Sequence, residues 1–464
     1  MILFEGRFTP VFADSTGSVG SYASVARDAD GFIYVSYYDE THGDLRLASN
    51  RSGWTTETVD SGGDVGGWTS LQFDWTPIPV LHIAYYDFNN RDLKYATRSP
   101  GGSWAIEVVD SSGDVGRGSS IAVNDLTRPV IVYWDATNEH LKYATRTPTG
   151  WQREVVDTNV GSGLGWSPSL AIDSTGKPHI SYYKDAGRDL YYATKSGTTW
   201  VKGPVDQVGD VGRYSTIAAK DDPQPGIPEI AYYDATNGDL KLARQLPGGA
   251  WERMVIDATG DVGMYPSLAL NHCVGPDCFD PPCPTIVYSD ATFGDLRRAT
   301  RPDGLCSVGH CPFIQDVVVH VGHIEPRGSF NLGVCPGQRR DVIATPIHTG
   351  GETQLMVLES RGASSVSDAP APPGRMLLSF ANPFAPPETI RFAIDKSGSV
   401  QVKIVDVAGR VVRSLADGTR QAGEHAIAWD GHDEHGALVA QGVYFFNVLV
   451  DGRQQAQQKL IVVR

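Results

Sequence analysis

The sequence has few cysteines, no long apolar run and no excess of positive charge. Its 464 residues include six cysteines, none of them before residue 273. No apolar run approaches the ~18 residues of a membrane-spanning helix, so we expect no transmembrane segment. Lys and Arg number 39 against 54 Asp and Glu, a net charge of -15. This balance argues against nucleic acid and anionic membranes as partners, because both are polyanions.

A string ending in aromatic residues and aspartate recurs along the chain at a period of about 50 residues. Its copies end at Asp39, Asp87, Asp135, Asp185, Asp234 and Asp290. Asp-Leu or His-Leu follows each copy, and five units continue with a tryptophan, namely Trp54, Trp104, Trp151, Trp200 and Trp251. GDVG or a related sequence separates the units. No segment combines a 3.6-residue period with helix formers, which excludes a helical solenoid.

Each unit reads as four short strands rich in Val, Ile, Tyr and Trp. In the second copy these are SLQFD, PVLHIAYYD, DLKYATR and WAIEVVD. Polar pairs such as the Asn-Gly in ATNGDL join the second strand to the third, which indicates a hairpin. Four antiparallel strands repeated at this period are typical of a β-propeller blade.

The blade count predicts seven blades over residues 1–360. Six units are plain, and a degenerate seventh follows with strands near GSFNLGV, RDVIATPI and TQLMVLES but no tryptophan-led fourth strand. The N-terminal FTPVFAD, ending at Asp14, matches a fourth strand. We therefore expect it to complete the last blade and close the ring, which pairs edges that would otherwise be exposed.

A second domain is expected after a linker. Residues 361–375 are rich in Ser, Ala and Pro and lack an apolar period, as linkers do. Residues 376–464 alternate in strand fashion with glycine-containing turns, which predicts a small β-sandwich. The chain is therefore predicted to be all-β, a seven-bladed propeller followed by an immunoglobulin-like sandwich.

The C-terminal domain resembles a known family. The residues that carry the resemblance are NPF, TIRFAI, VKIVDVAGRVVRSL, GEHAIAWDG and GVYFFNV, between Asn382 and Val448. They resemble the FlgD-like immunoglobulin-type domain, in the form that ends surface proteins exported by the type IX secretion system. The resemblance implies a sorting and anchoring module, the secretion machinery as a partner, and a secreted or cell-surface location. MILFEGRF shows no signal peptide, so we expect either a mature chain or a truncated reading frame.

The cysteines agree with an extracellular location. All six lie in the last two blades, and an even count in one region favours local disulfides in an oxidising compartment. They are Cys273, Cys278, Cys283, Cys306, Cys311 and Cys335. Sequence does not choose among the pairings. A zinc site is the weaker alternative, kept open by His310, His320 and His323 nearby.

Repeated aspartates are expected to gather on one propeller face, because both repeated polar loops emerge there. The expectation is a strongly negative face. Asp87, Asp92, Asp234 and Asp239 are the candidate ligands of a weak cation site, and calcium suits such hard oxygen donors. The competing interpretation is that these carboxylates accept backbone N–H bonds in turns and serve the scaffold.

A set of aromatic residues just after GDVG is the sharper candidate site, since the chain there enters the innermost strand. We call Tyr22, Trp68, Trp166, Tyr214 and Tyr265 the aromatic collar; Gly118 occupies the equivalent place in the third unit, and Arg117 and Arg213 precede two of these positions. Aromatic rings with a few arginines suit stacking on sugar rings or gripping an extended polymer. The alternative is that the rings cap the inner strands.

Catalysis has little support in the sequence. No H-E-x-x-H, G-x-S-x-G or Rossmann glycine pattern stands out, and the abundant paired carboxylates are repeats rather than one asymmetric pair. The sequence favours a secreted or cell-surface, non-catalytic propeller that binds glycan or another extracellular polymer. The alternatives are a polysaccharide-degrading hydrolase or lyase, and a structural surface or filament protein.

Overall fold

The computed structural model divides the chain into two compact units, Met1–Ser364 and Ser365–Arg464. The structure describes residues 3–4, 8–28, 30–74, 76, 79–124, 128–161, 168–220, 226–271, 283–300, 314–320, 331–335, 338–349, 352–360, 378–379, 388–394, 397–406, 410–421, 423–451 and 453–462. The predicted linker, residues 361–375, lies outside the described residues.

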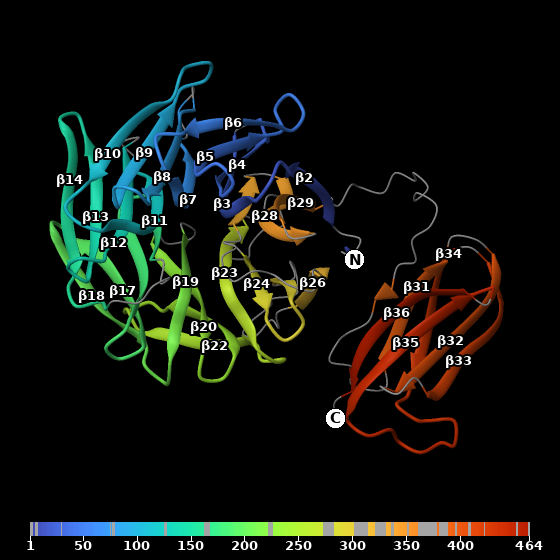
Figure 1. The fold of residues 1–464 in the computed structure, drawn as a ribbon. Coiled ribbons are helices and arrows are strands. Elements are labelled where there is room, and N and C mark those ends of the chain that lie inside the picture. Colours follow the sequence, from blue (N-terminus) through green and yellow to red (C-terminus); the bar gives the residue numbers. More distant parts are fainter. Residues whose placement is uncertain are drawn as a thin grey trace. The chain divides into compact units, whose positions relative to one another are not determined.

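The first unit is built from four-stranded antiparallel sheets that follow one another along the chain (Figure 1). Blade 1 contains β3 (Val19–Arg27), β4 (Ile33–Asp39), β5 (Asp44–Ser49) and β6 (Thr55–Asp60). Blade 2 contains β7 (Val65–Phe73), β8 (Leu81–Asp87), β9 (Asp92–Arg98) and β10 (Ala105–Asp110). Blade 3 contains β11 (Val115–Val123), β12 (Pro129–Asp135), β13 (His140–Thr147) and β14 (Gly150–Asp157). Blade 4 contains β15 (Ser169–Ile172), β16 (Pro178–Lys184), β17 (Asp189–Ser196) and β18 (Thr199–Asp206).

The last three blades complete the ring. Blade 5 contains β19 (Val211–Lys220), β20 (Ile227–Asp234), β21 (Asp239–Gln245) and β22 (Trp251–Asp257). Blade 6 contains β23 (Val262–Asn271), β24 (Cys283–Asp290), β25 (Asp295–Thr300) and β26 (Ile314–His320), with β1 (Leu3–Phe4) added at its edge. Blade 7 contains β27 (Asn331–Cys335), β28 (Gln338–Thr349), β29 (Glu352–Ser360) and β2 (Phe8–Asp14). Because β2 pairs with β29, the N-terminal strand closes the last blade, which confirms the predicted architecture.

The first strand of every blade contacts the first strand of a neighbouring blade, so these strands form the inner ring. Serines join them: the backbone N–H of Leu71 donates to Ser24 Oγ at 3.0 Å, and that of Ile121 donates to Ser70 Oγ at 3.1 Å. The contact of β27 with β3 closes the ring. The inner ring is therefore held by hydrogen bonds as well as by apolar packing.

The core lies between successive blades, because each sheet buries both faces against its neighbours. All seven residues of β8 are buried, and the clusters join residues of adjacent blades, for example Val35 with Leu355 and Tyr133 with Leu93. Large β-formers suit this wedge, since burying an aromatic side chain removes a large apolar area from water. The repeated Tyr and Trp are therefore mostly packing residues.

The second unit contains two sheets. One has the order β30 (Leu378–Ser379), β31 (Glu388–Ile394), β34 (Gly423–Trp429). The other has the order β33 (Val411–Arg420), β32 (Gly398–Asp406), β35 (Gly442–Val450), β36 (Arg453–Val462). Trp429 from the first sheet packs with Ile404 and Phe446 from the second in one buried cluster. The predicted immunoglobulin-like sandwich is thereby confirmed. In the described part of the chain, no helix has the length and hydropathy to cross a membrane.

Candidate functional site

The collar positions lie in a bulge at the start of the inner strands. In blade 2 the pairing of β7 with β8 shifts register twice, between Val65 and Gly67 and again between Gly67 and Ser70. Trp68 lies within the second shift, has no partner in the ladder, and adopts a left-handed backbone with φ 45°. The same conformation occurs at the equivalent positions Tyr22 (57°), Gly118 (61°), Tyr214 (55°) and Tyr265 (51°).

The glycine of the GDVG loop explains why this bulge forms. Gly66 has φ 115°, and a Cβ on it would lie 3.0 Å from the Cα of Leu45 in the preceding blade. Gly263 is tighter still, with a Cβ placed 2.6 Å from the Cα of Leu240. Only glycine permits both this backbone and this approach. The inner strand therefore begins in close contact with the preceding blade. It forms a bulge before it pairs in regular register with the second strand of its own blade.

Aromatic residues at left-handed positions carry backbone strain. The conformation costs an L-residue about 1–2 kcal/mol, and blade 3 avoids the cost with Gly118. Strained residues of this kind cluster at functional sites. Four of the described blades thus hold an aromatic ring where glycine would be easier to accommodate.

The structure brings the collar together in two pairs. The rings of Tyr22 and Trp68, from blades 1 and 2, have centroids 5.0 Å apart. Those of Tyr214 and Tyr265, from blades 5 and 6, are 4.1 Å apart, and the two hydroxyls lie 3.3 Å from each other. All four residues are partly exposed. Trp166 lies outside the described residues.

The first pair extends into a larger aromatic cluster that the sequence interpretation missed. Phe88, in the loop after β8, lies with its ring 5.8 Å from that of Trp68 and 5.5 Å from that of Tyr38. Tyr86 makes an edge contact with Trp68 at 5.4 Å. The available signal was the pair of tyrosines near the end of the second strand, Tyr85-Tyr86 in blade 2. Tyr85 is bonded to Asp60 of the preceding blade, and the second tyrosine, Tyr86, therefore points to the other face of the sheet.

The two predicted arginines are held beside the collar by their own loop. Arg117 pairs with Asp114 at 2.6 Å and lies 5.7 Å from the ring centroid of Tyr86. Arg213 pairs with Asp210 and lies 5.9 Å from the ring centroid of Tyr183. These arginines therefore fix the GDVG loops against the preceding blade's second tyrosine.

A different group, which we call the latch, joins each blade to the next. A buried tyrosine in the second strand donates its hydroxyl to the aspartate that ends the fourth strand of the preceding blade. The pairs are Tyr37–Asp14, Tyr85–Asp60, Tyr133–Asp110, Tyr182–Asp157, Tyr232–Asp206 and Tyr288–Asp257. A lysine or arginine joins most latches, for example Lys241 with Asp206 at 2.6 Å and Arg297 with Asp257 at 2.9 Å.

The latch controls the ionisation of its aspartates. Burial alone would raise the pKa of Asp110, but hydrogen bonds from Lys142, Ser112 and Tyr133 outweigh it and lower the pKa to about 2. The same balance lowers the pKa of Asp60 and Asp206. These carboxylates are ionised, buried and paired with cations.

The expected strongly negative face needs correction for this reason. Many of the repeated aspartates are buried rather than displayed, namely Asp14, Asp39, Asp60, Asp87, Asp110, Asp135, Asp157, Asp189, Asp206, Asp234, Asp257, Asp290 and Asp295. Backbone N–H groups of the turns donate to many of these carboxylates, and lysines or arginines of the next blade form ion pairs with others. Because these carboxylates are buried and paired, they add little negative electrostatic potential to the surface of the face.

The four candidate calcium ligands lie at the turn between the second and third strands. Asp87 faces Asp92 in register, and Asp234 faces Asp239. Asp87 Oδ1 accepts the backbone N–H groups of Asn89 and Asn90, and Asp234 makes the equivalent bonds.

Burial, followed by the charge of Asp87, raises the pKa of Asp92, and burial with the charge of Asp234 does the same for Asp239. Among the residues that the structure describes, no three His, Cys, Asp or Glu side chains form a metal-binding group. Calcium at these carboxylates remains a prediction.

The predicted disulfides and the zinc alternative are not described by the structure. Cys273, Cys278, Cys306 and Cys311 lie outside the described residues, as do His310 and His323. Cys283 begins β24 and Cys335 ends β27, and only their backbone placement is described.

The chain has distant likenesses among solved structures. AofleA from Arthrobotrys oligospora is 14% identical, with a TM-score of 0.44, over 67% of this chain and 92% of that one. A mutant of the Aleuria aurantia lectin in complex with Fucα1-6GlcNAc is 14% identical, with a TM-score of 0.41, over 63% of this chain and 96% of that one. A search of curated proteins gives no match. By its sequence, the C-terminal region matches the FlgD Ig-like domain over residues 388–453.

Proposed function

We propose that the protein is a non-catalytic propeller that binds an extracellular glycan or similar polymer through the aromatic collar. The observation that carries the proposal is the strained, left-handed backbone at Tyr22, Trp68, Tyr214 and Tyr265. The strained backbone lowers the free energy of unfolding, yet it holds partly exposed aromatic rings at equivalent positions of the inner ring. Packing alone does not require an aromatic residue at this position, because blade 3 forms the same bulge with Gly118.

Partly exposed aromatic rings suit the apolar C–H faces of sugar rings, and they supply contact area at low conformational cost. Two separate pairs, on blades 1–2 and 5–6, provide more than one point of contact for an extended chain. Several weak contacts to one polymer gain through avidity. A polymer with repeating sugar units therefore fits better than a single small molecule.

The state of the latch carboxylates favours binding over hydrolysis. A glycosidase needs one carboxyl held protonated and one free to attack or to activate water. In the described residues, hydrogen bonds from a tyrosine and a lysine lower the pKa of the latch aspartates Asp60, Asp110 and Asp206. Such groups are poor proton donors at neutral pH.

The proposal includes a cellular context. The FlgD Ig-like domain at residues 388–453 supports export by the type IX route and attachment at the cell surface, with the secretion machinery as partner. Disulfides among the six cysteines and calcium at the acidic turns belong to the same proposal. Deleting residues 376–464 should then leave the propeller unexported, which cell fractionation measures.

A glycan array tests the binding proposal, using the full chain with and without calcium. The proposal predicts a defined set of bound extended glycans, and weaker binding to them in the double variant Trp68→Ala, Tyr214→Ala. Phe293→Ala is the matched control, because Phe293 is 43% exposed and lies outside the collar. Thermal unfolding of each variant establishes that the fold survives. A double variant that binds as well as the parent removes the collar from the proposal.

A further inference from the structure

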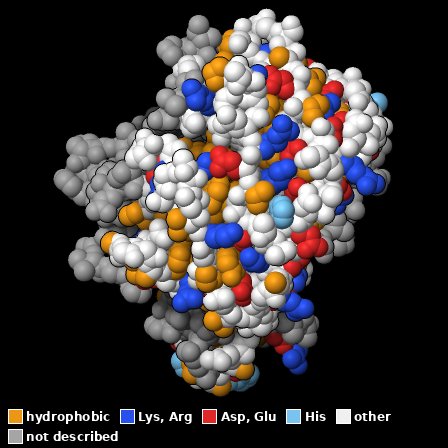
Figure 2. All heavy atoms as spheres, turned by 90° about the vertical axis from the view of Figure 1, so that its left-hand side faces the viewer, with side chains coloured by type: hydrophobic (Ala, Val, Ile, Leu, Met, Phe, Trp, Pro, Cys, Tyr) orange, Lys and Arg blue, Asp and Glu red, His pale blue; other side chains and the backbone are white. Residues whose placement is uncertain are grey.

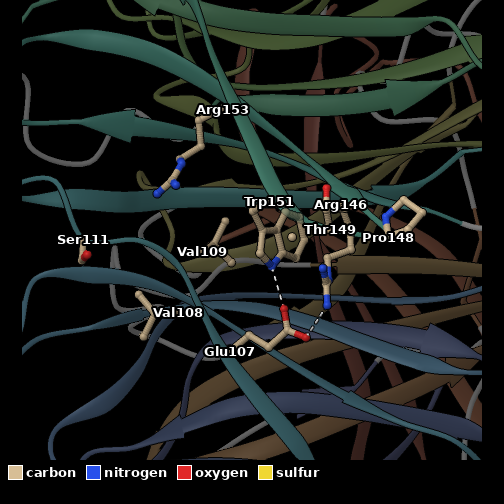
Figure 3. Close-up of a pocket in the computed structure, with 10 residues that line it drawn as sticks. Glu107, Val108, Val109, Ser111, Arg146, Pro148, Thr149, Trp151 and Arg153 are labelled. Atoms are coloured by element: carbon tan, nitrogen blue, oxygen red, sulfur yellow. Dashed lines mark hydrogen bonds and ion pairs between the residues drawn. The ribbon is translucent and has the colours of Figure 1, made fainter.

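A cavity of about 610 Å³ lies at the outer rim between blades 2 and 3 (Figure 3). One wall is formed by Glu107 and Val108 of β10 and by Ser111 just after it; the other includes Arg146 and Trp151 from β13 and β14. It is far along the sheets from the inner strands that hold the collar, since β10 is the outermost strand of blade 2. The cavity is therefore a separate place on the molecule.

Three side chains from two blades meet in this cavity. Glu107 Oε1 accepts from the Arg146 guanidinium at 2.8 Å, and Glu107 Oε2 accepts from the Trp151 indole N–H at 2.9 Å. Figure 3 shows both bonds converging on the carboxylate. Glu107 and Arg146 are each about one-third exposed, so they remain in reach of a ligand.

The same acid, base and tryptophan recur at the two adjoining blade interfaces; we call the outer rim of a blade interface a groove. Between blades 3 and 4, Glu154 accepts from Lys195 at 2.8 Å and from the Trp200 indole at 3.1 Å. Between blades 1 and 2, Glu57 accepts from Arg98 at 2.6 Å, and Arg98 lies 4.3 Å from the ring centroid of Trp104. The members of this repeated triad are Glu57–Arg98–Trp104, Glu107–Arg146–Trp151 and Glu154–Lys195–Trp200.

The next groove shows that the tryptophan packs without the charged pair. Between blades 4 and 5, Gly203 stands at the acid position and Gln245 at the base position, while Trp251 is kept. Its ring meets Tyr192 edge-on at 5.2 Å. Trp151 meets Tyr95 in the same way at 5.1 Å. The acid–base pair is therefore an addition to three grooves rather than a requirement of the inter-blade contact.

The chemistry of the triad points to a hydroxylated ligand. A carboxylate beside a guanidinium or ammonium group offers an acceptor and a donor, which matches two neighbouring hydroxyls of one sugar ring. The opposite charges balance, so a neutral ring is favoured over an ionic one. Val108 beside the cavity is 51% exposed and the equivalent Val155 is 45% exposed, giving an apolar wall for the C–H face.

The first groove holds an unused donor. The Trp104 indole nitrogen is buried and has no hydrogen-bond partner, whereas Trp151 and Trp200 each donate to their glutamate. An unsatisfied buried donor is costly, and a ligand hydroxyl would supply the missing acceptor.

We propose that the three triads are equivalent binding sites for a neutral pyranose ring with adjacent hydroxyls, separate from the collar. Figure 2 faces the side where β10, β14 and β18 lie in Figure 1, and shows hydrophobic and charged side chains interspersed over it. Three sites on successive blades would bind a branched or densely displayed glycan more tightly than any one alone.

Indole N–H signals in ¹H–¹⁵N NMR of the full chain test the proposal directly. The probes are D-glucose, D-galactose, D-mannose, L-fucose, D-xylose and N-acetyl-D-glucosamine, each to about 100 mM, well above a millimolar Kd. At least one sugar should shift the signals of Trp104, Trp151 and Trp200 and leave Trp251 unmoved. Glu107→Ala should abolish the Trp151 response alone, with Trp104 and Trp200 as controls in the same molecule.

A gain of site provides the converse test. Gly203→Glu with Gln245→Arg should build a fourth triad, because a Cβ at position 203 meets nothing within 4 Å. Trp251 should then respond to the same sugar. The variant Trp68→Ala, Tyr214→Ala should keep all three responses, which separates this proposal from the collar. If no sugar moves the three indoles, or if Trp251 of the parent moves equally, the proposal is overturned.

Discussion

The latch and the collar both repeat around the propeller, yet repetition has a different meaning in each. The latch repeats side chains that are buried and hydrogen bonded, such as Tyr133 with Asp110. The collar repeats a backbone conformation that aromatic residues such as Trp68 adopt only under strain. Repetition with satisfied contacts indicates a scaffold, whereas repetition with strain indicates a site.

The outer grooves stand between these two cases. Their tryptophans pack like scaffold residues, as Trp251 does against Tyr192. The acid–base pair is present in some grooves and replaced in another by Gly203 and Gln245. Partial repetition thus separates what the fold needs from what has been added to it.

The largest expected effect is the loss of one latch carboxylate. Asp110→Ala leaves Tyr133 buried without its acceptor and Lys142 with only its longer contacts to Ser112 and Asp135, which should cost about 3–5 kcal/mol of unfolding free energy. Asp92→Ala is the matched control, since burial and the charge of Asp87 raise the pKa of Asp92 and its charge is not stabilised. Denaturant unfolding of both variants measures the difference. Equal losses would show that the latch has no special role.

The pH dependence of stability should be intermediate in size. The folded-state pKa of Asp110, about 2, lies below the ordinary 3.8, so its contribution is complete above the ordinary value and is lost as pH falls toward 2. The loss corresponds to about 2 kcal/mol. Urea unfolding between about pH 6 and about pH 2.5 should show it in the parent and less of it in Asp110→Asn. Parallel curves for the two proteins would contradict the assignment.

The smallest expected effect is a difference in stability between glycine and alanine variants, which should have opposite signs at Tyr214 and Tyr232. At Tyr214 the left-handed backbone should make Tyr214→Gly more stable than Tyr214→Ala by about 1 kcal/mol. At the latch residue Tyr232, in a regular strand, Tyr232→Gly should be less stable than Tyr232→Ala by about 0.5–1 kcal/mol. Thermal or urea unfolding of the four variants measures both differences. The same order at both positions would remove the argument from strain.

Much of the fold could be predicted because propeller blades are local. Each blade is formed by consecutive strands joined by short turns, so the string ending at Asp87 and the tryptophan at 104 already delimit blade 2. The closure by Phe8–Asp14 was predictable as well, since an unmatched fourth strand was present and the last unit lacked one. Trp68 and Tyr214 could be singled out by their place after GDVG.

The partners of the repeated residues could not be predicted, because they lie in neighbouring blades. Nothing in the local pattern indicates that Tyr133 donates to Asp110 or that Glu107 meets Trp151, 44 residues away. The spacing of the sequence revealed the repeated aspartates but not their burial. A negative face was therefore expected, whereas the structure pairs many of these carboxylates with tyrosine, lysine or arginine.

The sequence by itself determined the architecture, because period-two strands, turn residues and a repeat of about 50 residues are properties of consecutive positions. Only the tertiary structure decided which repeated residues are scaffold and which are strained or left available. That distinction depends on what the adjacent blade places opposite each side chain. Asp110 becomes a latch because Tyr133 and Lys142 reach it, and Trp68 becomes a site candidate because its bulge leaves the ladder.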